Sequence, residues 1–178
     1  MRRKIVLIGM MGAGKTAIGT DLSRKLLVPF VDTDAEIERA AAMTITEIFA
    51  RDGEDFFRAR ESEVLARVLT GEPCVVSTGG GAWLRAENRD RIAAHGVSVW
   101  LNPDLETLWH RVRMRPTRPL LQTPDPRGTL ERLLAERLPV YRLADITVAV
   151  RRADLVEQTT ERVLRAIRET RPDILEPT

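Results

Sequence analysis

The residues GMMGAGKT, from Gly9 to Thr16, follow directly on the apolar run KIVLI at positions 4–8. The spacing Gly-x-x-x-x-Gly-Lys-Thr is typical of a phosphate-binding loop, in which glycines let successive backbone N–H groups point at phosphate oxygens. We expect Lys15 to reach the β- and γ-phosphates of a nucleoside triphosphate and the Thr16 hydroxyl to bind Mg²⁺. A helix starting near Lys15 adds a positive dipole end. The pattern predicts nucleotide binding but leaves the phosphate acceptor open.

Two acids, Asp32 and Asp34, stand in the sequence VDTD at the expected end of a second strand. Because side chains alternate along a strand, we expect both carboxylates on one side of it. One could hold the metal, directly or through water, and the other could bind or deprotonate an acceptor hydroxyl. The third strand ends without an acid, which favours Asp32 for the metal. The alternative for Asp34 is a helix N-cap.

Candidate groups for binding an acidic acceptor lie further along the chain. Arg58 and Glu61 are three residues apart in FFRARE, so one helix face can carry both, and the glutamate can aim the arginine fork at a carboxylate. The glycines at 79–81 bring bare backbone close to a ligand. Arg137 stands in ERLPVY. From the local sequence, a surface ion pair, a flexible turn and an ordinary exposed arginine remain open alternatives for these three features.

Strands and helices alternate along the chain and must position these residues. Short β-branched runs predict strands at 4–8, 29–34, 74–78, 97–101 and 146–150. Helical spacing predicts helices at 15–27, 35–51 (one or two, capped by Thr44 or Thr46), 54–70, 83–94, 104–114, 129–143 and 154–169. Such alternation indicates a parallel sheet covered on both faces, with ligands at the carboxyl ends of its strands.

One segment interrupts this alternation. Residues 115–128, RPTRPLLQTPDPRG, hold four prolines and are expected to form a long loop. Loops of this length in a compact domain are often lids. Pro119 restricts the backbone after Arg118, and the segment has few large apolar side chains, so we expect it to close only over bound ligands.

Composition excludes several classes of function. The 178 residues fit one domain, and no apolar run approaches the roughly 20 residues of a membrane span. A net charge of +2 and 4% aromatic residues argue against nucleic-acid binding. The single cysteine, Cys74, lies in an apolar run and is expected to be a buried hydrophobe in a reducing, cytoplasmic compartment.

Taken together, these motifs resemble the shikimate kinase family over nearly the whole chain. The segments GMMGAGKT, FVDTD, EIFARDGEDFFRARE, STGGGA, TRPLL and RLPVY occur in the family's order and at similar spacing. The resemblance implies transfer of the γ-phosphate of ATP to the 3-hydroxyl of shikimate, in aromatic amino-acid synthesis. It implies an α/β, three-layer P-loop kinase fold, with five parallel strands ordered 2-3-1-4-5 and a lid. Family members are commonly monomeric.

The resemblance also implies roles for individual residues. It divides the single domain, 1–178, into a phosphate loop at 9–17, a shikimate-binding region at 32–62 and a lid at 112–128. The implied catalytic residues are Lys15, Asp34 and Arg118. The implied ATP site adds Gly12, Ala13, Gly14, Thr16, Ala17, Arg111 and Arg152, and the metal site is Thr16 with Asp32. The implied shikimate site is Asp34, Arg58, Gly79, Gly80, Gly81 and Arg137, with Glu61 orienting Arg58.

The chain departs from the family pattern at a few positions. Ala17 replaces a usual Ser or Thr, a change that keeps the backbone N–H. The last strand leads into RRADL rather than a turn with Pro, which departs from the family pattern at the very place where the resemblance offers Arg152 as the late adenine contact. Three alternatives were weighed: a gluconate kinase, a nucleoside monophosphate kinase and a non-catalytic nucleotide-binding module. The last would be expected to lack Lys15, Asp34 or Arg118, and all three are present.

Overall fold

The computed structural model describes residues 1, 3–115 and 121–175. Its five strands form one parallel sheet in the order β2-β3-β1-β4-β5, which confirms the predicted fold class. The strands are β1 (Lys4–Ile8), β2 (Phe30–Asp32), β3 (Val75–Ser77), β4 (Gly96–Pro103) and β5 (Ile146–Val150). The helices are α1 (Lys15–Leu26), α2 (Thr33–Ala41), α3 (Ile45–Thr70), α4 (Ala86–His95), α5 (Leu105–Val112), α6 (Pro126–Tyr141) and α7 (Val156–Thr170), with short 3₁₀ helices η1 (Ala82–Leu84) and η3 (Pro172–Ile174).

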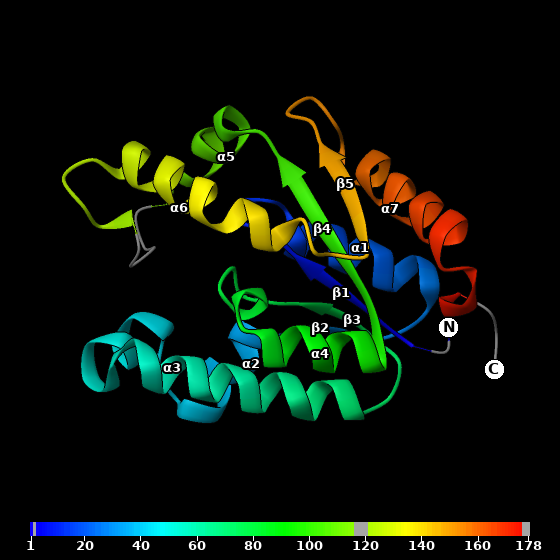
Figure 1. The fold of residues 1–178 in the computed structure, drawn as a ribbon, viewed down its shortest axis with the longest axis horizontal. Coiled ribbons are helices and arrows are strands. Elements are labelled where there is room, and N and C mark those ends of the chain that lie inside the picture. The colour runs from blue at the N-terminus through cyan, green and yellow to red at the C-terminus, as the bar shows by residue number, and fades with distance from the viewer. Residues whose placement is uncertain (2, 116–120, 176–178) are drawn as a thin grey trace.

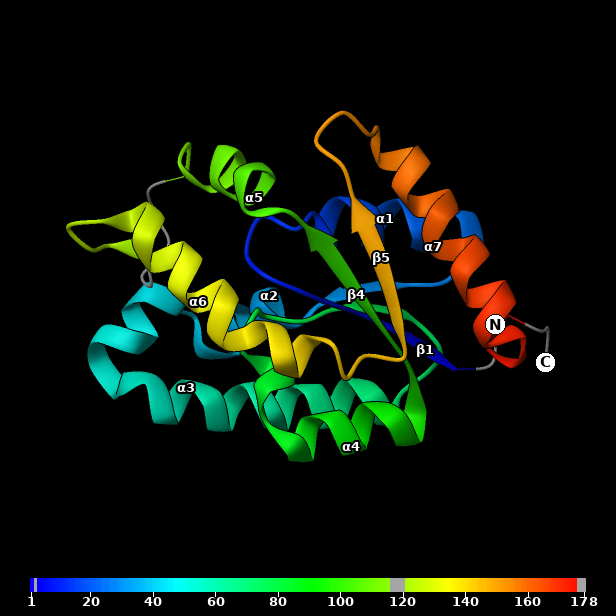
Figure 2. The same cartoon turned by 45° about the horizontal axis from the view of Figure 1, so that its top comes forward.

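Helices cover the sheet on both faces, as Figures 1 and 2 show. Helices α1 and α7 pack against each other, α1 against β3 and α7 against β5, while α4 contacts β4 and carries α3 on its outer side. The strands β1 and β3 are buried along their whole length, as expected for central parallel strands. Cys74 lies in this core, so its expected role as a buried hydrophobe is confirmed.

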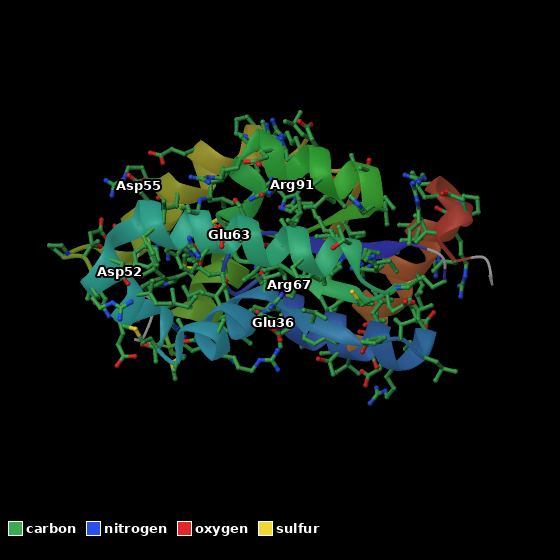
Figure 3. The ribbon with its side chains drawn as sticks, turned by 90° about the horizontal axis from the view of Figure 1, so that it is seen from below. Glu36, Asp52, Asp55, Glu63, Arg67 and Arg91 are labelled. Atoms are coloured by element: carbon green, nitrogen blue, oxygen red, sulfur yellow. The ribbon has the colours of Figure 1, made fainter. Side chains whose placement is uncertain are left out.

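A second, smaller apolar cluster lies apart from the main core, between α2 and α3. Ile37, Ile48 and Phe57 form its buried centre. Thr44 starts α3 with a capping box, because its side chain accepts from the N–H of Glu47 while the Glu47 carboxylate accepts from the N–H of Thr44. Outside the cluster, charged side chains face solvent, and Arg67 of α3 donates to Glu36 of α2 at 3.1 Å (Figure 3).

The predicted break between the helices at 35–51 and 54–70 is confirmed, because α3 kinks where Gly53 has a φ of 84°, and Thr44, one of the two predicted caps, starts α3. Two other boundary predictions were wrong for physical reasons. The strand β2 ends at Asp32, so Asp34 belongs to α2 and does not share a strand face with Asp32. The predicted loop at 115–128 is too long, because α6 already begins at Pro126, capped by Asp125.

The described residues contain no helix that is both long and apolar enough to cross a membrane. Residues 116–120, which hold Arg118 and Pro119, lie outside the described residues, so the prediction of a lid stays a prediction.

Candidate active site

The phosphate loop joins β1 to α1 at the carboxyl edge of the sheet. Gly12 and Gly14 have φ of 80° and 95°, a left-handed conformation that other residues adopt only at a cost. Gly14 precedes α1 directly, so the free N–H groups of the first helical turn face the loop. The Lys15 ammonium group folds back over the loop and donates to the carbonyls of Gly9 at 2.7 Å and Met10 at 3.0 Å.

The side chains of Thr16 and Asp32 meet beside this loop. The Thr16 hydroxyl donates to Asp32 Oδ2 at 3.3 Å. The other oxygen, Asp32 Oδ1, caps α2 by accepting from the N–H groups of Asp34 and Ala35, so the N-cap considered for Asp34 belongs to Asp32. One hydroxyl and one carboxylate oxygen are hard donors that suit Mg²⁺, which usually takes its remaining ligands from phosphates and water. No group of three or more acidic, His or Cys side chains that could hold a metal occurs among the described residues.

A cavity of about 840 Å³ opens above the phosphate loop. Its wall includes residues predicted for ATP, namely Gly12, Gly14, Lys15, Thr16, Ala17, Asp32 and Arg111. The guanidinium group of Arg111 donates to the carbonyl of Gly12 at 3.0 Å, which fixes it against the loop. Ala13 is fully buried and its N–H donates to Met10 O at 3.1 Å, so it does not line the cavity.

Arg152 also stands outside the lining of this nucleotide cavity. It lies beside one of its walls, 3.4 Å from Nδ1 of His110, and lowers the pKa of that histidine. The far end of the cavity is formed instead by the start of α7, with Leu155, Val156 and Thr159. The adenine contact predicted for Arg152 therefore stays a prediction.

A second cavity, of about 580 Å³, lies between the phosphate loop and the α2–α3 unit. All residues predicted to bind the acceptor line it: Asp34, Arg58, Glu61, Gly79, Gly80, Gly81 and Arg137. The predicted pairing on α3 is confirmed, since Arg58 Nη1 donates to Glu61 Oε1 at 2.9 Å. Arg58 also lies over the ring of Phe57, 5.1 Å from its centroid, and Phe57 belongs to the small apolar cluster. That packing fixes the direction of the guanidinium group.

Arg137 enters the same cavity from α6. The residue is only 6% exposed, yet it has no ion pair with any carboxylate of the described residues. A buried cation without an anionic partner is costly, and a bound anion would remove that cost. This arrangement favours an anionic ligand between Arg137 and Arg58.

Asp34 and Glu61 face each other across Gly79. Burial, reinforced by the charges of Glu61 and Asp32, raises the pKa of Asp34 to about 6. Burial also raises the pKa of Glu61, although Arg58 opposes the change. Asp34 Oδ1 and Glu61 Oε2 are buried with no hydrogen-bond partner among the described residues. Both atoms are therefore available to a hydroxyl group of a ligand.

The three glycines at 79–81 make room for these side chains. A Cβ atom on Gly79 would lie 2.7 Å from Glu61 Oε2 and 2.8 Å from Asp34 Oδ1. On Gly80 it would lie 3.1 Å from Arg137 Nη1, and on Gly81 only 2.3 Å from Arg58 Nη1. The alternative of a flexible turn is therefore wrong. The three glycines form the floor of the cavity, closely packed against charged side chains.

The two cavities meet along five residues of the described chain: Met11, Asp34, Gly79, Gly80 and Arg115. Two of the five, Asp34 and Arg115, are charged. A chemical group transferred from one cavity to the other would therefore move past a carboxylate and a guanidinium group. Sequence reasoning missed Met11 and Arg115. Met11 could have been found from its place inside the phosphate loop, whereas Arg115 carries no local signal that separates it from neighbouring arginines.

A phosphate loop after the first strand of a 2-3-1-4-5 sheet, next to an arginine-lined second cavity, defines a P-loop kinase with a small anionic acceptor. Comparison with known proteins narrows this class. Residues 11–168 match the family model described as shikimate kinase. The chain belongs to the shikimate kinase family.

Individual relatives agree with this assignment. The chain is 59% identical over 176 residues to the shikimate kinase of Cereibacter sphaeroides, covering 99% of this chain and 87% of the relative. It is 56% identical to that of Ruegeria pomeroyi, covering 99% and 90%. Among solved structures, the shikimate kinase of Acinetobacter baumannii in complex with shikimate superposes with a TM-score of 0.91 at 36% identity, covering 96% of each chain. The gluconate kinase and nucleotide-binding module are thereby set aside.

Proposed function

We propose that this chain transfers the γ-phosphoryl group of ATP to the 3-hydroxyl of shikimate, forming shikimate 3-phosphate and ADP for aromatic amino-acid synthesis. One observation carries the proposal. Two arginines and Asp34 line a cavity that opens, past Asp34, into the cavity of the phosphate loop. An acceptor with one carboxylate and several ring hydroxyls matches that set of groups, because the arginines bind the acid and the orphaned oxygens bind hydroxyls.

On the acceptor side, Arg58 and Arg137 would hold the carboxylate of shikimate. Glu61 keeps Arg58 in place through the 2.9 Å hydrogen bond, leaving the remaining N–H groups of Arg58 for the ligand. Arg137, which lacks a carboxylate partner among the described residues, would gain one on binding. The pair would fix the carboxylate end of the ring, so that the 3-hydroxyl is directed to the junction at Asp34.

On the nucleotide side, backbone N–H groups of the phosphate loop and Lys15 would bind the phosphates. Lys15 already bridges two loop carbonyls and would turn towards the β- and γ-phosphates when these enter. Thr16 and Asp32 would hold Mg²⁺, which supplies positive charge to the phosphate oxygens. Arg118, which the sequence resemblance assigns to the transferring phosphate, remains part of this proposal.

Asp34 would act on the 3-hydroxyl. With a pKa of about 6, Asp34 is mostly ionised at pH 7 and can accept the hydroxyl proton. That pKa is also close to the pH at which the enzyme works, which suits a general base. Asp34 lines both cavities, so an acceptor hydroxyl bound to it would lie next to a phosphate that enters from the other cavity. Because members of the family are commonly monomeric, we infer that the enzyme acts as a cytoplasmic monomer.

The experiment is a coupled ADP-release assay with shikimate, gluconate and nucleoside monophosphates, joined to titration calorimetry with shikimate. Arg58→Ala should raise the KM for shikimate about tenfold to hundredfold and leave that for ATP unchanged, since charge-assisted hydrogen bonds contribute roughly 1.5–3 kcal/mol. Arg60→Ala is the matched control, because Arg60 lies on the same helix, is exposed and pairs with Glu63. Faster turnover with another acid, or normal shikimate affinity in Arg58→Ala, would contradict the proposal.

A further inference from the structure

Tyr141 lies directly behind the acceptor cavity without lining it. Its side chain is fully buried at the end of α6, with its ring against that of Trp100 at a centroid distance of 5.8 Å. The hydroxyl group donates to the carbonyl of Gly80 at 2.6 Å. Gly80 is one of the glycines that form the floor of the cavity, so this hydrogen bond fixes the floor from below.

The same hydroxyl lies beside the guanidinium group of Arg137, one helical turn earlier on α6. Residues four apart on a helix share a face, which brings the two side chains together. Burial raises the pKa of Tyr141, and the nearby Arg137 opposes that change. The tyrosine therefore stays protonated, and it donates its one proton to the carbonyl of Gly80.

Met10 completes this arrangement from the phosphate loop. It is only 1% exposed, and its sulfur lies 3.7 Å from both Arg137 Nη1 and the Tyr141 hydroxyl oxygen. A thioether is a weak acceptor, but it is a polarisable group placed where a buried cation needs one. Its backbone carbonyl accepts from Lys15 at 3.0 Å, so one residue touches both the nucleotide-binding lysine and the acceptor-binding arginine.

The guanidinium group of Arg137 needs such support. It has no carboxylate partner among the described residues. It packs close to Gly80, which has no side chain, and a Cβ atom there would lie 3.1 Å from Nη1. Without a fixed neighbour, a long side chain of this kind would sample several rotamers and bind a carboxylate less well. The Met10 sulfur lies next to Arg137 Nη1 and to the Tyr141 hydroxyl, which places both residues behind the guanidinium group.

We propose that Tyr141 is a positioning residue for shikimate binding: its hydroxyl holds the Gly80 carbonyl and the Arg137 guanidinium group in the binding geometry, with the Met10 sulfur as the third contact. The inference rests on the proposed function, since it takes shikimate as the ligand of Arg137. Tyr141 lines neither of the two cavities. It acts by keeping two parts of the acceptor site, one from α6 and one from the loop after β3, in fixed register.

The test is Tyr141→Phe, which keeps the buried ring and removes only the hydroxyl. We expect the KM for shikimate to rise about tenfold, from the loss of one strong and one weaker hydrogen bond, with the kcat and the KM for ATP nearly unchanged. Trp83→Phe is the control, because Trp83 is also buried and its indole N–H donates to Val140 O of the same helix at 2.8 Å, away from both cavities. It should lower the melting temperature and leave the KM for shikimate as in the wild type.

Two further variants separate positioning from packing. In an Arg137→Ala background, Tyr141→Phe should raise the KM for shikimate by clearly less than tenfold, because part of its effect acts through Arg137. Should Tyr141→Phe fail to fold, Met10→Leu removes the sulfur at similar volume and should raise the KM for shikimate about threefold, the effect of a weak contact. Wild-type KM values in every variant that folds would overturn the inference. Failure of the wild-type enzyme to phosphorylate shikimate would instead overturn the proposed function.

Discussion

The phosphate loop and the loop at 79–81 are both rich in glycine, but for different reasons. In the phosphate loop, Gly12 and Gly14 have positive φ, so glycine is needed for the backbone conformation itself. None of the glycines at 79–81 has φ in the left-handed range. There, glycine is needed because charged side chains from α2, α3 and α6 occupy the space that a Cβ would fill.

This difference extends to how the two cavities are built. The phosphate loop joins β1 to α1 next to the main core, and on the proposed function it would bind phosphate chiefly through backbone N–H groups. The acceptor site depends on buried charged side chains, and its α2–α3 wall rests on a small separate core. The nucleotide side is therefore determined by local backbone geometry, whereas the acceptor side is determined by contacts between distant segments. Substitutions on the nucleotide side and on the acceptor side should therefore have different effects.

The largest effect is expected from Lys15→Met on the nucleotide side. It should lower kcat by about 10²–10³-fold, the usual effect of removing one hydrogen-bond donor that stabilises charge in the transition state. The protein should stay folded. Lys25→Met is the matched control, because Lys25 lies at the other end of α1 in an exposed pair with Glu161. A turnover assay with MgATP and shikimate, together with a melting curve, measures both. Near-normal turnover in Lys15→Met would contradict the role of the phosphate loop.

Asp34→Asn should have the next largest effect, at the junction of the two sides. We expect kcat to fall about 10²-fold or more, because asparagine cannot accept the hydroxyl proton, while the KM for ATP changes little. In the wild type, kcat/KM for shikimate should fall as the pH is lowered through about 6, since protonation of Asp34 removes the base. The exposed Asp55→Asn serves as control. A loss of ATP affinity with unchanged kcat would move Asp34 to the nucleotide side.

The sequence predicted the strand, loop and helix of the nucleotide side, because their signal is local. The glycine spacing of the phosphate loop, the strand before it and the helix after it are contiguous in the chain, and the structure has them as expected. The pair of Arg58 and Glu61 was predictable for the same reason, since a three-residue spacing on a helix brings two side chains together.

The rest of the site depends on tertiary contacts that no local pattern records. Asp34 was assigned to a strand because VDTD reads as extended, but the side chain of Asp32 caps a helix that starts one residue later. The burial that raises the pKa of Asp34 comes from its approach to Glu61 and Gly79, which are distant in sequence. Arg115 shows the same limit, because only the folded chain reveals that it lines both cavities.

Alanine substitutions should distinguish the two kinds of glycine. Gly81→Ala should raise the KM for shikimate about tenfold, because its Cβ would displace the guanidinium group of Arg58 and weaken a charge-assisted contact. Gly12→Ala should instead raise the KM for ATP by a similar factor, since a side chain at φ of 80° strains the loop by about 1–2 kcal/mol.

Relief variants make this comparison sharper. In an Arg58→Ala background, Gly81→Ala should raise the KM for shikimate little further, because the guanidinium group that the new Cβ would displace is gone. Val112→Ala removes the atom nearest to the new Cβ in Gly12→Ala, yet it should not restore ATP binding, since the strain lies in the backbone. Restored ATP affinity in Gly12→Ala with Val112→Ala would show that crowding requires the glycine in the phosphate loop too, and an undiminished loss in Gly81→Ala with Arg58→Ala would show that Arg58 is not what requires glycine at position 81.

The smallest effect should appear in the stability of Asp34→Asn. The pKa of Asp34 rises from 3.8 to about 6 on folding, so the folded state binds more protons than the unfolded state between these values. Asp34 therefore costs no stability below about pH 4, costs progressively more as the pH rises, and has its full cost above pH 6. Two pKa units correspond to at most about 3 kcal/mol, and partial exposure of the residue reduces the expected figure to about 2 kcal/mol.

Asp34→Asn should accordingly be more stable than the wild type at pH 8, by about 2 kcal/mol in urea unfolding, and lose most of that advantage when the pH falls to about 4. Lys15→Met should show no such gain, because Lys15 donates to two backbone carbonyls in the free enzyme and its loss leaves them without those hydrogen bonds. The contrast follows from the two ways of building the site: the acceptor side keeps an unpartnered carboxylate oxygen in place for a hydroxyl, at a cost to the fold. Equal or lower stability of Asp34→Asn at pH 8 would mean that the carboxylate is already stabilised in the free enzyme, and that shikimate meets no unsatisfied acid there.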